Sequence, residues 1–226
     1  MINIWIDFFD KNVLQRIITG LVFVFLFITA ILIGGFYFNL FFLLILTLIL
    51  YEVNILLIKN YFLIIIINII IIISLFYFII LRFVLGDDAT SNLLYIIFCI
   101  WIFDSFSLIG GKLLKGKKLF PKISPNKTYS GLITGFLSLF IISFIFLSSI
   151  SMLKIEIVIL TLLIGFLAFI GDALESYFKR IVNIKDSSTL LPGHGGFLDR
   201  MDAFILIFFV HFLLNLFGYK EIYLYV

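Results

Sequence analysis

Long apolar stretches are the feature that most restricts how this chain can fold. Within one of them, Ile64–Ile67 and Ile69–Ile73 consist of isoleucine alone, and hydrophobic residues make up 64% of the sequence against 13% charged residues. A soluble domain is roughly 45–50% apolar and about 25% charged. The stretches are also far longer than the about 9–11 residues of an outer-membrane barrel strand. The sequence therefore predicts a helical membrane protein.

Seven stretches are suitable for membrane-spanning helices, each of which needs about 20 residues at 1.5 Å per residue. They cover residues 17–35, 37–57, 62–81, 91–111, 131–152, 156–177 and 202–218. Residues 1–16 mix apolar and charged side chains, which predicts a short interfacial amphipathic helix. We therefore expect an all-α, polytopic membrane bundle of about seven transmembrane helices, forming a single integral membrane domain over residues 1–226.

The distribution of Lys and Arg between the loops indicates an orientation in the membrane. With the N-terminus in the cytoplasm, all but three of the 16 Lys and Arg residues lie on the cytoplasmic side, the exceptions being Arg82, Lys154 and Lys220. The two long polar loops, residues 112–130 and 178–201, then face the cytoplasm, where nucleotides are available. We expect an inner-membrane protein whose functional site is built from these loops.

Other features of the composition narrow the range of partners. The net charge of +3 gives no reason to expect nucleic acid. Cys99 is the single cysteine, so it cannot form an internal disulfide, and we interpret it as a small packing residue. The apolar run from Ile17 is too long for a signal-peptide core, so no cleavable signal is expected. Membrane lipids are expected partners, and the broad apolar exterior is compatible with a homodimer.

Acidic residues gather at two predicted helix ends on the cytoplasmic side. They are Asp172 and Glu175, which share a helix face with Ser176 and Lys179, and Asp199 and Asp202 at the start of the last span. Carboxylate oxygens suit Mg²⁺, which proteins usually hold with one or two carboxylates plus substrate phosphates. A simpler interpretation is an ion-paired helix face for the first group and a favourable helix-dipole interaction for the second. Asp104, in the fourth span, is a third acidic candidate.

The loop that joins these helix ends is basic and rich in glycine. Its basic residues are Lys179, Arg180, Lys185, His194 and Arg200. Such cations can neutralise phosphate oxygens. The run Pro192-Gly193-His194-Gly195-Gly196 permits positive φ angles and a close approach of the backbone to a ligand, although a tight structural turn is the alternative. We interpret His194 as a contact to a phosphate or a leaving group.

The earlier loop, residues 112–130, is also basic. A basic cytoplasmic loop often reflects only membrane orientation and attraction to anionic lipids. Its glycines and Ser124-Pro125 nevertheless predict a shaped loop. The loop lacks the G-x-x-x-x-G-K-[ST] pattern of a P-loop.

The segment from Ser176 to Asp202 resembles the signature of the phosphatidate cytidylyltransferases, also called CDP-diacylglycerol synthases. The resemblance rests on the order of Lys-Arg, Pro, His-Gly-Gly and Asp-Arg-x-Asp, and on Gly-Asp and Glu-Ser in the preceding helix. A second shared element runs from the Asp104 helix to Thr128. The sequence departs from the family after Asp104, where Gly-Ala-Tyr is usual, and at Tyr129, which replaces a frequent Trp.

The resemblance implies transfer of the cytidylyl group of CTP to phosphatidate, with Mg²⁺ as the cofactor, in phospholipid biosynthesis. It implies Asp172 and Asp199 as metal ligands. The implied catalytic residues are these two aspartates with Lys179, Arg180, His194 and Asp202. The implied substrate-binding residues are Asp104, Lys112, Lys122, Ser124, Asn126, Lys127, Thr128, Glu175, Ser176, Lys185 and Arg200.

Two other functions remain open from the sequence. A CTP-dependent lipid kinase of the dolichol or phytol kinase type would share the membrane helices and the nucleotide but would release CDP, and kinship to it would not predict the whole signature. A transporter could line its pathway with the same aspartates, although the paired broken helices of many transporters are not evident. The D-G-x-x-A-R motif of a CDP-alcohol phosphotransferase is absent from the sequence.

Overall fold

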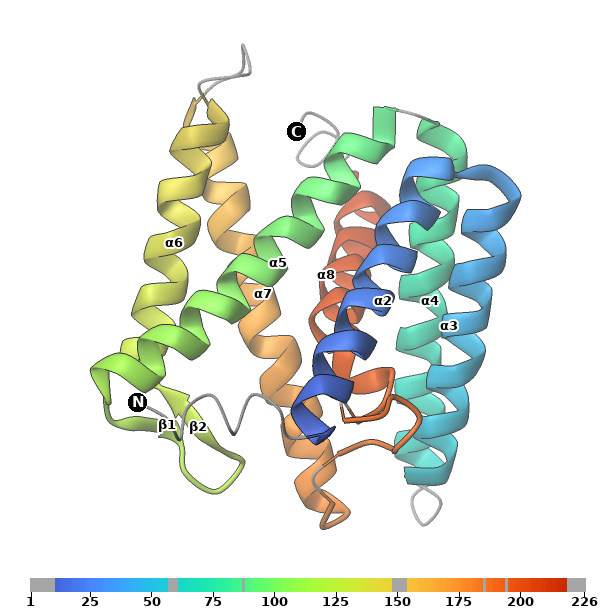
Figure 1. The fold of residues 1–226 in the computed structure, drawn as a ribbon. Helices are drawn as coiled ribbons and strands as arrows, with labels where there is room; N and C mark the ends of the chain where they lie inside the picture. The colour runs from blue at the N-terminus through green and yellow to red at the C-terminus, as the bar shows by residue number, and fades with distance from the viewer. Residues whose placement is uncertain are drawn as a thin grey trace.

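The computed structural model describes residues 11–56, 61–86, 88–147, 154–184, 186–193 and 195–218. In this part of the chain it shows seven helices and one two-stranded hairpin (Figure 1). The elements are α2 (Lys11–Ile33), α3 (Gly35–Leu56), α4 (Tyr61–Leu85), α5 (Asp88–Leu114), β1 (Lys118–Phe120), β2 (Ser124–Thr128), α6 (Tyr129–Leu147), α7 (Lys154–Ile181) and α8 (Leu198–Leu216). The predicted all-α membrane bundle is confirmed. Of the predicted interfacial helix, residues 1–10 lie outside the described residues, and residues 11–16 begin α2.

Four of the described helices are long and apolar enough to cross a membrane. They are Gly35–Leu56, Tyr61–Leu85, Thr90–Leu114 and Ile155–Ile181. The stretches Ile17–Ile33 and Tyr129–Ile145 are apolar but shorter. Large apolar side chains such as Phe25, Phe62 and Phe83 point outward and are well exposed, as expected where lipid replaces water. The chain is therefore an integral membrane protein, and the count of seven spans stays a prediction.

Helix α8 holds the two halves of the bundle together. It packs against α7 on one side and against α4 on the other, so it lies between the α6–α7 pair and the α3–α4 pair (Figure 1). Helix α5 runs obliquely across the bundle and packs mainly on α6. The N-terminal end of α8 is consequently surrounded by other helices.

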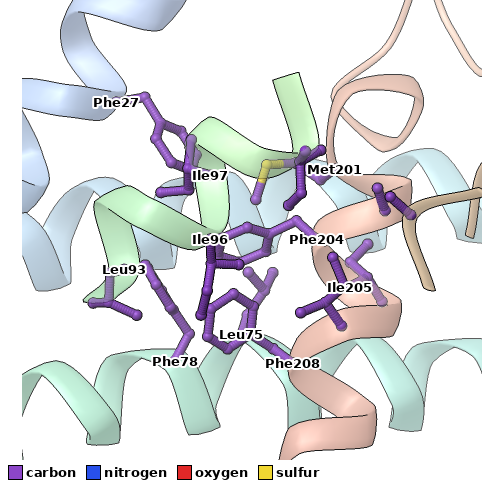
Figure 2. Packing of buried hydrophobic residues seen from close by; sticks show 14 of the residues in the cluster. Phe27, Leu75, Phe78, Leu93, Ile96, Ile97, Met201, Phe204, Ile205 and Phe208 are labelled. Atoms are coloured by element: carbon purple, nitrogen blue, oxygen red, sulfur yellow. The ribbon is translucent and has the colours of Figure 1, made fainter. Parts of the chain in front are cut away.

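Aromatic side chains form the centre of the core. The ring centroid of Phe78 in α4 lies 4.7 Å from that of Phe204 and 4.8 Å from that of Phe208, both in α8. Figure 2 shows Ile96 of α5 among these rings, and the ring centroid of Phe27 in α2 lies 5.9 Å from that of Phe204. Because lipid tails are as apolar as these side chains, close van der Waals packing is what favours this contact over exposure to lipid.

The segment 112–130, expected from the sequence as a shaped loop, contains the hairpin. Its strands pair in antiparallel fashion, with Lys118 opposite Thr128 and Phe120 opposite Ser124. The Phe120 ring stacks on Phe169 of α7, with the ring centroids 6.0 Å apart. This contact holds the hairpin against α7.

Candidate active site

The site begins where α7 and α8 cross. A Cβ atom placed on Gly171 of α7 would lie 2.9 Å from the Cα of Ala203 and 2.9 Å from the carbonyl oxygen of Asp202, both in α8. A small residue at a membrane helix crossing lets the two backbones approach closely. Side chains next to Gly171 are therefore brought against the first turns of α8.

Three carboxylates meet at this crossing, and we call Asp172, Glu175 and Asp202 the acidic trio. One carboxylate oxygen from each residue lies within 4.8 Å of the other two. Asp172 and Glu175 come from α7, and Asp202 comes from α8. Like charges at this separation repel strongly unless cations are present. The arrangement therefore creates a strong local demand for positive charge.

Two lysines supply part of that charge. The Lys127 ammonium lies 2.8 Å from Oδ2 of Asp172, and the Lys179 ammonium lies 2.7 Å from Oε2 of Glu175. The Ser176 hydroxyl donates a 3.3 Å hydrogen bond to Oδ1 of Asp172. The Asp172 side chain is 40% exposed whereas that of Glu175 is only 8% exposed. The trio is therefore more accessible at Asp172.

Lys127 reaches the trio because the hairpin rests on α7. Its ammonium lies 3.4 Å from the carbonyl oxygen of Phe169 and 4.9 Å from the centre of the Phe169 ring. A cation over an aromatic face is stabilised by the ring quadrupole. The structure thus brings Lys127, from the polar segment 112–130, into contact with Asp172 of α7. Helix α7 leads into the other polar segment, residues 178–201.

Asp199 forms a second centre. Its Oδ1 atom lies 2.7 Å from the Lys179 ammonium, and its Oδ2 atom accepts hydrogen bonds from the amides of Ser187 at 3.0 Å and Gly196 at 2.9 Å. Burial of Asp199 opposes its ionisation, but hydrogen bonds from the Gly196 amide, the Lys179 ammonium and the Ser187 amide outweigh that effect and hold its pKa below the usual range. Asp199 is therefore a stable anion in the folded protein.

Asp172 and Asp199, which the resemblance implied as metal ligands, lie in two different environments. Asp172 belongs to the acidic trio. The oxygens of Asp199 are directed to Lys179 and to two amides of the adjoining loop. Gly195 has φ 82°, and a Cβ atom there would overlap the Asp199 carboxylate, so the loop wraps closely around this side chain. The pairing of Asp172 with Asp199 around one ion stays a prediction.

The arginines and Asp104 complete the surroundings. Arg180 donates hydrogen bonds to the carbonyl oxygens of Ile123 at 3.0 Å and Ile184 at 2.7 Å, so it ties the hairpin to the loop after α7. Asp104 and Arg200 line the same cavity as Asp202. The position of Asp104 is compatible with the role in substrate binding implied by the resemblance, which stays a prediction.

Two cavities border the trio. The larger, of about 280 Å³, lies between α2, α5 and the start of α8. Its polar lining includes Asp104, Asp199, Arg200 and Asp202, whereas Phe23 and Trp101 are among its apolar lining residues. The smaller, of about 130 Å³, is walled mainly by apolar residues of α3, α4, α7 and α8 but reaches Glu175, Lys179 and Asp202. Asp202 contributes to both cavities.

The remaining predicted residues lie in the segment 112–130 or outside the described part of the chain. Lys112, Lys122 and Asn126 are exposed, and Ser124 is half-buried in the hairpin. The Thr128 hydroxyl accepts a 3.1 Å hydrogen bond from the Gly131 amide at the start of α6. Lys185 and His194 lie outside the described residues. Their assigned roles stay predictions.

Sequence reasoning missed Glu52 of α3. This residue is only 1% exposed, and its carboxylate accepts hydrogen bonds from the amides of Phe197 and Leu198, at the start of α8. In the sequence it was only an interruption of the second apolar span. A carboxylate inside an apolar helix is costly unless it has partners, and this cost is the signal that could have revealed it.

Comparison with known proteins identifies the family of this chain. The sequence profile described as "Cytidylyltransferase family" matches residues 58–217, which is more than half of the chain. The chain belongs to this family. The family resemblance inferred from the signature residues is thereby confirmed.

Several relatives in this family are named phosphatidate cytidylyltransferase. The protein from Rickettsia typhi is 38% identical over 217 residues, which cover 92% of this chain and 93% of the relative. The protein from Rickettsia conorii is 42% identical over 151 residues, 61% of this chain and 64% of the relative. The protein from Bacillus subtilis is 40% identical over 122 residues, 53% of this chain and 45% of the relative. The chain thus spans less than two thirds of the length of several relatives that it matches.

Proposed function

We propose that this protein transfers the cytidylyl group of CTP to phosphatidate, which yields CDP-diacylglycerol and pyrophosphate for phospholipid biosynthesis. Family membership supports the reaction class, and the relatives' names support the substrates. The observation that carries the proposal is the acidic trio at the α7–α8 crossing, flanked by Lys127 and Lys179 and bordered by a cavity with polar and apolar walls. Such a site suits a reaction between a phosphorylated nucleotide and a phosphorylated lipid.

The donor set of the trio fits Mg²⁺, the cofactor that we propose. Mg²⁺ prefers oxygen ligands and is usually held by one or two carboxylates together with water and substrate phosphates. Asp172 and Asp202, with Glu175 as a third donor, would hold the ion, since their oxygens already converge. The bound ion would neutralise charge on the triphosphate oxygens. A site that used Asp199 instead would require this residue to give up Lys179 and two amides.

The reaction needs positioning more than proton transfer. An oxygen of the phosphatidate phosphate attacks the α-phosphorus of CTP, the bond from this phosphorus to the bridging oxygen breaks, and pyrophosphate leaves. Because the attacking group is already an anion, a protein base is not required, and orientation with charge stabilisation dominates. Among the described residues, Lys127 and Lys179 pair with the trio, and each is placed to exchange a carboxylate for a phosphate oxygen.

The surroundings of the trio suit a lipid substrate. The lining of the larger cavity includes the charged residues Asp104 and Arg200 together with the apolar residues Phe23 and Trp101. We propose that the phosphate groups bind near the charged residues while the acyl chains remain among the apolar helices. We also propose an inner-membrane location, with residues 112–130 and 178–201 facing the cytoplasm, which is the source of CTP. We propose that the protein forms a homodimer, which a mass measurement in detergent would test.

The proposed function is tested by following the α-phosphate of CTP. Purified protein is incubated with Mg²⁺, phosphatidate in detergent micelles and CTP labelled at the α-phosphate. We expect the label to enter the lipid phase while pyrophosphate is released. Label that stays in water as CDP would establish a lipid kinase instead, and absence of turnover would contradict both enzymatic assignments.

A further inference from the structure

Glu52 is a buried carboxylate for which the proposed reaction has no direct use. It lies near the end of α3, in a helix that is otherwise mostly apolar, and it is 1% exposed. A buried charge is strongly unfavourable unless it is paired or fully hydrogen-bonded. The partners of Glu52 therefore indicate why the residue is there.

All the described hydrogen-bond partners of Glu52 belong to one segment, far away in the sequence. Its Oε1 atom accepts hydrogen bonds from the Phe197 amide at 2.9 Å and the Ser188 hydroxyl at 2.7 Å. Its Oε2 atom accepts hydrogen bonds from the Leu198 amide at 2.8 Å and the Ser187 hydroxyl at 3.2 Å. Each carboxylate oxygen thus receives two donors, so the charge is well compensated.

Two of these donors are the amides at the start of α8. The first amides of a helix lack partners within the helix, and Phe197, at the N-cap position, has no side-chain oxygen to accept a hydrogen bond. Glu52 takes that role from another helix, and its negative charge is favoured at the positive end of the α8 dipole. Helix α3 thereby fixes where α8 begins.

The same segment is also held by Asp199. Ser187 donates its hydroxyl to Glu52 and its amide to Asp199. A Cβ atom on Gly196 would lie 2.6 Å from both oxygens of Glu52, so the backbone passes directly over the carboxylate. Any movement of Glu52 must therefore move the loop that leads into α8.

We propose that Glu52 is a positioning residue for the reaction at the acidic trio. It holds the start of α8, and so it sets the placement of Asp199 in the first turn and of Asp202 one turn later. This inference rests on the proposed function for its effect on turnover. The anchoring of the segment itself is a separate property of the fold and is measured separately.

The test uses Glu52→Gln, which keeps the size of the side chain. Glutamine offers one acceptor oxygen and an NH₂ group that can only donate, so about half of the four donors lose their acceptor. Residues that support catalytic ligands typically cost about 10–100-fold in activity when replaced. We expect a fall of this size in kcat, with little change in the KM for CTP, and a partial recovery in Glu52→Asp. We also expect faster hydrogen exchange in a peptide containing residues 197–198, measured without substrates.

Asn215→Leu is the matched control. Asn215 lies at the other end of α8 and donates a 2.8 Å hydrogen bond to the Tyr77 hydroxyl of α4. Its loss should lower the unfolding temperature while leaving kcat and the exchange of residues 197–198 unchanged. The control therefore separates general weakening of the α8 packing from release of its first turn.

The exchange rate and kcat of Glu52→Gln together decide the outcome. Faster exchange together with reduced kcat in Glu52→Gln supports the proposal. Unchanged exchange, faster exchange with unchanged kcat, or a rise in KM alone overturns it. If Glu52→Gln does not fold, the double variant Ser187→Ala, Ser188→Ala is judged by the same criteria. If the wild-type protein does not transfer the cytidylyl group, the proposed function fails, while the exchange data still decide whether Glu52 anchors α8.

Discussion

The first turns of α8 and its middle are stabilised by different interactions. Its first turns carry Asp199 and Asp202 and lie against α7, where Gly171 allows close backbone contact. Its middle carries Phe204 and Phe208, which fill the core against Phe78 of α4 (Figure 2). The core contact depends on shape, whereas the acidic end depends on charge compensation and hydrogen bonds. One helix thus joins an aromatic core to a cluster of carboxylates.

The largest effect is expected at the acidic end, from Asp172→Asn and Asp202→Asn. Each change removes an anionic ligand from the trio, and loss of one such electrostatic contribution costs about 10²–10³-fold in kcat. Both variants should also need more Mg²⁺ for half-maximal activity, as measured by titration of the labelled-CTP assay. Full activity of either variant at the wild-type Mg²⁺ concentration would show that the trio does not hold the ion.

Asp199→Asn is the control for the proposal that Asp172 and Asp202 hold Mg²⁺. We expect it to lower both activity and the unfolding temperature, because the variant weakens the Lys179 ion pair, but to leave the Mg²⁺ requirement unchanged. A raised Mg²⁺ requirement would favour Asp172 and Asp199 as the ligand pair. Because folding lowers the pKa of Asp199, its contribution to stability is complete above the unfolded pKa of about 3.9 and is lost only in stronger acid.

A smaller loss is expected from Gly171→Ala. The added Cβ would lie 2.9 Å from the α8 backbone, so the two helices must separate by a few tenths of an ångström or more. Since misplacement of a catalytic group by about 1 Å can cost 10²-fold, we expect a loss of roughly tenfold in kcat. Ala168→Gly, one turn earlier in α7, is the control for altered helix propensity. Equal kcat values for wild type and Gly171→Ala would contradict the importance of the close crossing.

Lys127→Gln is expected to act mainly on substrate binding. The change removes one charge-assisted contact, and a hydrogen bond to a charged group is worth about 1.5–3 kcal/mol. At the lower end of this range, the expected loss is about tenfold in kcat/KM. Lys122→Gln, an exposed lysine of the same hairpin, is the control and should have a weaker effect. Similar losses for both variants would indicate a general attraction by the basic loop.

The smallest effect on activity is expected in the core, from Phe208→Leu. Phe208 is fully buried among aromatic rings, and a change in core packing typically costs about 0.5–3 kcal/mol in stability. The unfolding temperature in detergent should fall while kcat below that temperature stays within about twofold of wild type. A loss of kcat as large as that of Asp172→Asn would show that the acidic first turns of α8 depend on the packing of its middle.

Much of the fold follows from the length of the apolar stretches. A helix satisfies its own backbone hydrogen bonds within a membrane, so the runs around Ile64–Ile73 and at 156–177 could be assigned as helices without knowledge of their neighbours. The hairpin at 118–128 was expected only as a shaped loop. Its strands are short and polar, and their pairing depends on support from α7 through Phe120 and Phe169.

The position of the candidate site along the chain was easier to predict than the contacts between side chains of different helices. The spacing of Asp172, Glu175 and Lys179 places them on one helix face, which is a local property of α7. Periodicity does not show which face of α8 meets that surface. The Glu52 contacts are even harder to predict from periodicity. They join α3 to a segment that is separated from it in the sequence by three transmembrane-length helices.

By itself, the sequence determined that the chain is a helical membrane protein and that it belongs to the cytidylyltransferases, and it predicted a site at the helix ends around residues 172–202. These conclusions depend on apolar length, on motif order and on spacing within single helices. Only the tertiary structure decided that Asp202 joins Asp172 and Glu175, that Asp199 pairs with Lys179, and that Glu52 holds the start of α8. These are contacts between helices, and side-chain packing at each crossing selects which residues come within hydrogen-bonding distance.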